Sequence, residues 1–261
     1  MQTLKILRQH TQLPVPQVVE CKGNVGQGGL PFLIVTYLPG RRLSELASEL
    51  TVADQNTIDR TLGSYTRSLT SLSATQFGMA HRVFDGRGHK SWKEAFLALL
   101  EAALRDAEDM LVTMPYDNIR YYVTQHSHVL DEVVKPTLVA LDVCSPDNVL
   151  IDEETKRVTG LVGFSNALWG DALMCGGLAN GSEAFFEGFG ECPARTASIR
   201  IRTLMYVITP MPDFPHADMP SYAIYRNILT VAAHHYRPHT NTDELASRRD
   251  LVYAINELAR M

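Results

Sequence analysis

The chain has 261 residues and a mass of 29.1 kDa, and its 24 Lys+Arg against 29 Asp+Glu give a formal charge of −5. A hydrophobic content of 45% and a charged content of 20% are typical of globular proteins, which excludes a wholly disordered or fibrous chain. The acidic balance, without any cluster of Lys and Arg, excludes a nucleic-acid-binding protein. We expect one or two domains with a hydrophobic core.

The N-terminal residues alternate polar and apolar side chains at helical intervals, unlike the continuous apolar run of a signal peptide. No segment approaches the roughly 20 apolar residues of a membrane span. We therefore predict a cytoplasmic protein with no membrane partner. Cys21, Cys144, Cys175 and Cys192 form no C-x-x-C pair, so we expect reduced thiols and neither a zinc site nor a disulfide framework.

The first 40 residues predict one helix and one hairpin. The helix should end near Pro14, because prolines disfavour helical backbone before them. Residues 16–21 and 31–38 have strand composition and flank the glycine-rich segment 23–29, which indicates a β-hairpin. This segment leads into a strand and not into a helix, so it is not predicted to bind phosphate.

The remainder is predicted to be mainly helical. Apolar residues at intervals of three and four predict helices between residues 43 and 72, over 92–112 and over 116–133. Short β-like runs follow at 137–141, 148–151 and 158–162. From residue 181 the pattern is helical again, interrupted by a proline-rich loop at 209–221 that is either a lid or an ordinary surface loop.

Four segments, in the right order, resemble one family. Residues 138–152, LVALDVCSPDNVLID, resemble the catalytic loop of the aminoglycoside phosphotransferase and choline kinase family, and 158–171, VTGLVGFSNALWGD, resemble its metal-binding segment. HTQLPVP at 10–16 and YLPG at 37–40 resemble two upstream landmarks. The resemblance implies an α+β, protein-kinase-like fold, with a truncated N-terminal lobe (1–40) and a mainly helical C-terminal lobe (41–261) that carries a remodelled catalytic segment, 138–171.

Several parts that this resemblance assigns to phosphoryl transfer are altered. The reaction needs a glycine-rich loop, a strand Lys, a catalytic Asp, and an Asn and a second Asp that hold magnesium. Only nine residues precede His10, so we expect the first two parts to be absent. Asp142 matches the catalytic Asp, but Asn148 follows it by six residues where the family has five, and Gly163 stands in place of the metal-binding Asp. We therefore predict no magnesium, no ATP and no other cofactor.

Three functions remain open. The first is an ATP-independent enzyme, such as a cyclase, isomerase or lyase. It would act on a small organic substrate in the cleft that holds the nucleotide in the family, in keeping with a natural-product pathway. The second is a pseudokinase-like binding protein without turnover. The third is an atypical small-molecule phosphotransferase that retains Asp142 and Asn148. The first is preferred, because an Asp in an apolar cavity can serve as a general acid or base.

Asp142 is the predicted catalytic residue, with loop stabilisation as its alternative role. The predicted substrate-binding residues are Asn148, Ser165, Asn166, Trp169, Phe185 and Tyr225. For the three aromatic residues, packing in the helical core is the alternative. We expect a packed thiol at Cys144 and a structural role for Asp171, and no metal ligation by the histidines.

Overall fold

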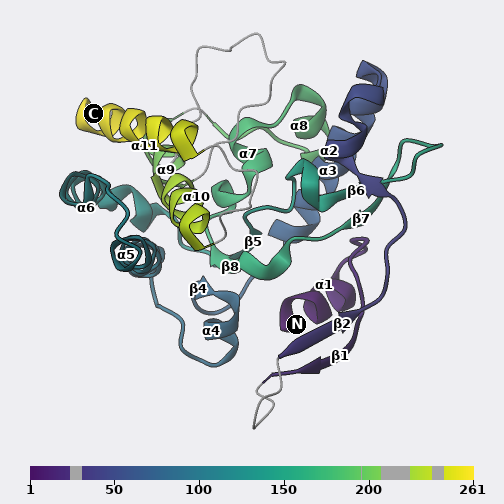
Figure 1. Cartoon of the computed structure of the whole chain (residues 1–261), viewed down its shortest axis with the longest axis horizontal. Helices are drawn as coiled ribbons and strands as arrows, with labels where there is room; N and C mark the ends of the chain where they lie inside the picture. The colour runs from purple at the N-terminus through teal and green to yellow at the C-terminus, as the bar shows by residue number, and fades with distance from the viewer. Residues whose placement is uncertain (24–30, 195, 207–223, 237–243) are drawn as a thin grey trace.

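The computed structural model describes residues 1–23, 31–194, 196–206, 224–236 and 244–261 (Figure 1). The first half of the chain contains α1 (Gln2–His10), β1 (Val18–Lys22), β2 (Phe32–Val35), β3 (Arg41–Arg42), α2 (Leu43–Leu46), α3 (Val52–Thr70), β4 (Gly78–Met79), α4 (Ala80–Phe84), α5 (Trp92–Asp109) and α6 (Tyr116–Gln125). The second half contains β5 (Thr137–Ala140), β6 (Val149–Ile151), β7 (Val158–Leu161), β8 (Ala167–Gly170), α7 (Gly176–Asn180), α8 (Glu183–Phe189), α9 (Ala197–Tyr206), α10 (Ile224–Tyr236) and α11 (Glu244–Ala259). Short 3-10 turns connect several of them: η1 (Ala47–Glu49), η2 (Ser127–Glu132), η3 (Pro146–Asn148), η4 (Phe164–Asn166) and η5 (Ala172–Met174). None of the described helices is long and apolar enough to cross a membrane.

The predicted N-terminal helix and hairpin are confirmed. Helix α1 ends before Pro14 because Thr11 caps it, with both its amide and its hydroxyl donating to the Leu7 carbonyl, at 2.9 and 2.5 Å. Strands β1 and β2 pair antiparallel, with Val18 opposite Val35. Most of the predicted turn, residues 24–30, lies outside the described residues.

Helix α3 fixes the position of the segments around it. It begins with a capping box, in which Thr51 and Asp54 each satisfy a backbone amide of the other. It packs on α8 at very short range: a Cβ added to Gly63 would lie 1.9 Å from the Phe185 carbonyl oxygen, and one added to Gly188 would lie 1.8 Å from the Arg60 carbonyl oxygen. Only glycine permits this approach of the two backbones.

Two three-stranded antiparallel sheets carry the predicted catalytic segment, with strand orders β3-β6-β7 and β4-β8-β5. β5, β6 and β7 confirm the three predicted β-like runs. β8 was not predicted, because it is short and buried on both faces and so lacks the alternation that marks a half-buried strand. In its pairing with β5, Ala140 lies opposite Ala167 and Thr137 lies opposite Gly170.

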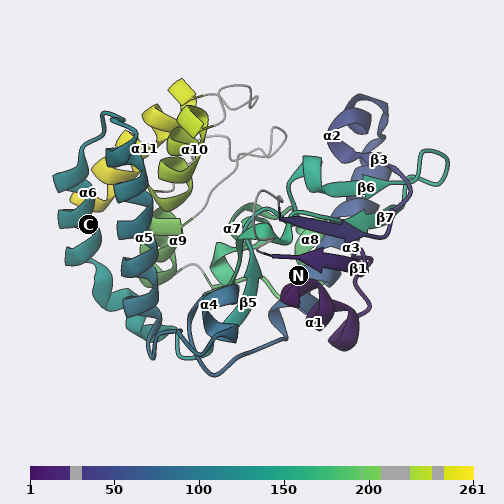
Figure 2. The ribbon, with the colours of Figure 1, turned by 60° about the horizontal axis from the view of Figure 1, so that its bottom comes forward.

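Helices α5, α6, α9, α10 and α11 gather on one side of the molecule, and α1, α2, α3 and the hairpin lie on the other (Figure 2). The prediction of one helix over 116–133 was wrong at its end: α6 stops at Gln125, and the 3-10 turn η2 (Ser127–Glu132) follows. The proline-rich segment 209–221 lies outside the described residues. The division of the chain at residue 40 stays a prediction.

Candidate functional site

The loop after β5 is folded into two tight turns that take up the extra residue. The Ser145 amide donates to the Asp142 carbonyl at 3.0 Å, and the Asn148 amide donates to the Ser145 carbonyl at 2.8 Å. Val143 is buried beneath the loop. The turns keep Asn148 next to Asp142. A hydrogen bond joins the two residues, from the Asn148 side-chain amide to the Asp142 backbone carbonyl oxygen at 2.8 Å.

The Asp142 carboxylate is held by two side chains from other parts of the chain. One oxygen accepts from the Arg226 guanidinium of α10 in an ion pair. The other lies 3.4 Å from the Asn166 amide, which donates to it. The side chains of Asp142 and Arg226 remain 20% and 31% exposed, so both can be reached from solvent.

Arg226 was not among the predicted site residues. It lies 84 residues after Asp142 and belongs to no motif, so only the fold brings the two together. Asp142 thus has a guanidinium at the carboxylate that the family resemblance assigns to orienting a substrate hydroxyl.

Gly163 begins the turn after β7 in the left-handed conformation, with φ 86° and ψ 27°. A Cβ added there would lie 2.5 Å from the Asn148 amide nitrogen and 2.6 Å from its Cγ, closer than real contacts allow. The Asn148 side chain therefore lies where any side chain at position 163 would begin. Asn148 thus occupies the space that the side chain of a metal-binding Asp at position 163 would need.

Magnesium does not fit these residues. Of the two side chains that the resemblance assigns to the metal, Asn148 uses its amide nitrogen to donate to the Asp142 carbonyl and has only its Oδ1 to offer, and Gly163 offers no ligand. Magnesium prefers near-octahedral oxygen coordination by carboxylates and phosphates. The described residues contain no group of three or more His, Cys, Asp or Glu that could hold a metal ion.

The other predicted substrate-binding residues fall into two sets. Ser165 and Asn166 are exposed on the turn between β7 and β8, next to Asp142. Trp169, Phe185 and Tyr225 are buried in the core. The Trp169 ring meets Phe84 edge-on, and the Tyr225 ring lies 5.9 Å from that of Phe96, centroid to centroid. The three aromatic side chains thus pack in the core, which is the alternative to the substrate-binding role predicted for them. The site that we propose below does not include them.

A cleft of about 540 Å³ lies beside the segment that joins β2 to β3. Its apolar lining residues are Pro16, Val35, Leu38, Leu150 and Val162, and its other lining residues are Thr36, Tyr37, Gly40, Arg41, Arg42 and Glu45. The volume falls within the range of small-molecule sites. Val162 precedes Gly163, and Leu150 follows Asn148 by two residues, so one side of the cleft continues into the altered catalytic segment.

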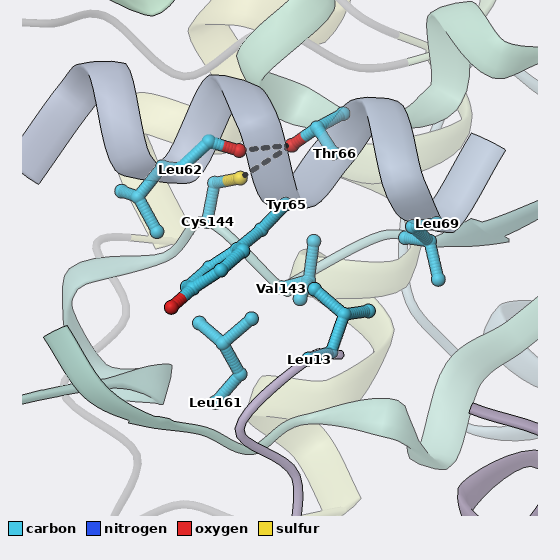
Figure 3. A pocket seen from close by; sticks show the side chains of 8 residues that line it. All are labelled: Leu13, Leu62, Tyr65, Thr66, Leu69, Val143, Cys144 and Leu161. Carbon is cyan, nitrogen blue, oxygen red and sulfur yellow. Dashed lines mark hydrogen bonds between the residues drawn. The ribbon is translucent and has the colours of Figure 1, made fainter. Parts of the chain in front are cut away.

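A second hollow, between α3 and the catalytic loop, is packed and closed. Figure 3 shows Cys144 directed toward Thr66 of α3, and their sulfur and oxygen atoms lie 3.5 Å apart. Leu13, Leu62, Tyr65, Leu69, Val143 and Leu161 complete the lining, which leaves no space for a water molecule (Figure 3). Burial raises the pKa of the Cys144 thiol to about 11, so it is no nucleophile at neutral pH.

Asp171 belongs to a buried polar network at the other end of β8. Its carboxylate accepts from Arg202 at 2.6 Å and from the Leu173 amide at 3.1 Å. Burial raises the pKa of Asp171, while the Arg202 guanidinium opposes that rise. Tyr206 interacts with Asp171 and accepts from the Trp92 indole at 2.6 Å. The contacts support the structural role predicted for Asp171.

The fold is shared with solved aminoglycoside phosphotransferases. The ternary complex of APH(2")-IIa with streptomycin and ATP has a TM-score of 0.55 at 14% identity, covering 100% of this chain and 78% of that one. A thermostable mutant of APH(4)-Ia, in ternary complex with AMP-PNP and hygromycin B, has a TM-score of 0.64 at 13% identity, covering 99% and 82%. At these identities the likeness shows the fold alone.

Comparison at the level of sequence gives the family. No curated protein matches the sequence significantly. The model of the phosphotransferase enzyme family matches residues 1–174, about two thirds of the chain and all of the segment from α1 to Asp171. The chain therefore belongs to the phosphotransferase enzyme family.

Proposed function

We propose that this protein binds a small organic molecule in the cleft beside β2 and does not phosphorylate it with magnesium-ATP. The observation that carries the proposal is the state of Asp142, whose carboxylate is held by Arg226 and Asn166. A substrate hydroxyl would have to compete with both of these donors for the carboxylate that the resemblance assigns to orienting it.

The metal position supports the same proposal. Gly163 supplies no ligand, so only the Asn148 side-chain oxygen is left of the two side chains that the resemblance assigns to the metal. In phosphoryl transfer the metal ions neutralise the charge that develops on the phosphates, and the effect is worth several kcal/mol. Arg226, the arginine that contacts Asp142, has its charge balanced by that carboxylate.

The cleft supports binding. Its volume of about 540 Å³ suits a small molecule, and its apolar walls come from β2, β6 and the segments before β1, after β2 and after β7. The structural neighbours bind antibiotics such as streptomycin and hygromycin B together with nucleotides. We infer that this chain uses the same scaffold for a small organic ligand.

Two variants on β2 test the site. Val35→Trp should fill the cleft, because Val35 lines it and is already 37% exposed. Ile34→Trp is the matched control, since Ile34 is also exposed but does not line the cleft, and neighbouring strand residues point to opposite faces. We expect small molecules that raise the thermal midpoint of the native protein to lose this effect in Val35→Trp and to keep it in Ile34→Trp. ATP consumption with hydroxylated acceptors that depends on magnesium and is lost in Asp142→Asn would overturn the proposal.

A second candidate is an ATP-independent enzyme of the cyclase, isomerase or lyase type. The observation in its favour is that the Asp142–Arg226 pair is partly exposed, so an anionic ligand that draws Arg226 away would free the Asp142 carboxylate as a base. Mass spectrometry of a bound compound, incubated without nucleotide, separates the two candidates. Conversion that Asp142→Asn abolishes supports the enzyme, and recovery of unchanged ligand supports the binding protein.

A further inference from the structure

We propose that the ligand of the cleft beside β2 is an apolar, planar molecule with a single carboxylate, and that Arg42 binds this carboxylate. The inference rests on the proposed function and adds the chemical class of the ligand. It is argued from the charges at the mouth of the cleft and from the side chains that line it.

Two arginines line the cleft, and their surroundings differ. Arg41 is surrounded by carboxylates: Glu153 lies 3.4 Å away, Glu45 lies 3.5 Å away and Glu49 lies 3.9 Å away. Hydrogen bonds to Glu153, the largest cause, raise the pKa of Arg41 further. Arg41 is therefore committed to the protein.

Arg42 has no such partner. It is exposed, and no hydrogen bond or ion pair joins its guanidinium to any residue in the described part of the chain. Its backbone is fixed, because Arg42 pairs with Leu150 across β3 and β6. A fixed residue thus places a planar, permanently charged donor at an apolar cleft, and this donor matches the geometry of a carboxylate.

The remaining lining selects an apolar and planar body. Leu38 and Leu150 both pack over Gly160, where an added Cβ would lie 2.9 and 3.0 Å from one terminal methyl group of each. Tyr37, at the mouth, is 84% exposed, an unusual position for an aromatic ring unless it packs against something else. An aromatic body would place one face against this ring and the other against the leucines.

The charge balance argues for a monoanion and against a polyphosphate. Glu45 lines the same cleft, and Glu45, Glu49 and Glu153 all lie within 4 Å of Arg41, beside Arg42. These carboxylates repel any anion, and they repel a chain of phosphates more strongly than a single carboxylate. The cleft therefore favours an aryl carboxylate over a nucleotide.

Three probes of the same shape test the charge: 2-naphthoate, 2-naphthamide and 2-(aminomethyl)naphthalene, with dissociation constants measured by NMR titration of the full chain. We expect 2-naphthoate to bind about tenfold more tightly than the amide, and the amine to bind most weakly. Arg42→Gln should bring the three probes to within about twofold of one another. Arg82→Gln, an exposed arginine on α4 away from the cleft, is the matched control and should leave the order unchanged.

The outcomes separate the two proposals. Equal binding of the three probes that Val35→Trp abolishes would overturn the role of Arg42 and leave the small-molecule site intact. Naphthoate binding that survives Val35→Trp would overturn both. ATP that binds more tightly than naphthoate would also contradict the inferred ligand class.

Discussion

Asp142 and Asp171 lie at opposite ends of the strand pair β5 and β8, and their surroundings differ. Asp142 follows β5 and Asp171 follows β8, and because the strands are antiparallel the two carboxylates lie at opposite ends of the sheet. Each is paired with an arginine from a C-terminal helix, Arg226 of α10 or Arg202 of α9. The Asp171 pair is only 7% and 11% exposed, whereas the Asp142 pair is 20% and 31% exposed. The same chemical pair thus stabilises the fold at one end and occupies the site at the other.

Arg202→Ala, which removes the charged partner of Asp171, should cause the largest loss of stability. It leaves the Asp171 carboxylate buried without its charged partner, and removing one member of such a pair costs about 3–5 kcal/mol. Urea unfolding at pH 7 measures this loss. The control, Arg200→Ala, removes a more exposed arginine of the same helix, which pairs with Glu257, and should cost under about 1 kcal/mol. Equal losses for the two variants would contradict the contrast.

Gly163→Ala tests whether the turn after β7 requires glycine at this position. Left-handed backbone costs a residue with a Cβ about 1–2 kcal/mol, and here the Cβ would also collide with Asn148. Gly86→Ala is the matched control, because Gly86 has φ 71° with nothing within 4 Å of an added Cβ. We expect Gly163→Ala to be the more destabilising of the two in chemical denaturation, and Asn148→Ala in the same chain to reduce the difference. A cost no greater than that of Gly86→Ala would show that Asn148 moves aside freely.

Arg226→Ala should cost little stability, in contrast with Arg202→Ala. The pair is partly solvated, so solvent screening keeps its contribution under about 1 kcal/mol. A double-mutant cycle with Asp142→Asn, read from urea midpoints, gives the coupling directly. A coupling above about 2 kcal/mol would place this pair with the structural one and weaken its assignment to the site.

The thiols beside the two aspartates give the smallest effect near neutral pH, and this effect grows as the pH rises. Burial raises the pKa of Cys144 to about 11 and that of Cys175 to about 12, whereas Cys21 and Cys192 are exposed. At pH 8 we expect a disulfide reagent to label two thiols in the folded protein and four in denaturant. Because the unfolded thiols lose their protons near pH 9 and the folded ones do so later, stability should fall as the pH rises above 9. Rapid labelling of Cys144 at pH 8 would contradict its burial.

The sequence predicts the scaffold better than the site. The helical periodicity and the hairpin signals are local, so α1, β1, β2, α3 and α5 could be predicted from neighbouring residues alone. Gly163 and the longer spacing between Asp142 and Asn148 could also be read directly. The effect of these two changes on each other could not be predicted, because the collision of Asn148 with any side chain at position 163 depends on how the loop folds.

Contacts between distant segments account for the rest. Arg226 meets Asp142 only because α10 packs near the catalytic loop, and no spacing in the sequence predicts that pair. Trp169, Phe185 and Tyr225 were predicted in a substrate pocket because they belong to the half of the chain that forms it, and the structure places them in the core. An aromatic residue in a helix or in a short buried strand has the same local pattern in both places.

The affinity of the protein for ATP with and without magnesium tests the central claim most directly, because it asks whether the altered segment still holds the metal. With Gly163 in place of the second metal ligand and only the Asn148 side-chain oxygen left, we predict that 5 mM magnesium, set against an equal ionic strength of sodium chloride (about 15 mM), does not tighten ATP binding. Tightening of about tenfold or more that Asn148→Ala removes would show a working metal site and contradict the account.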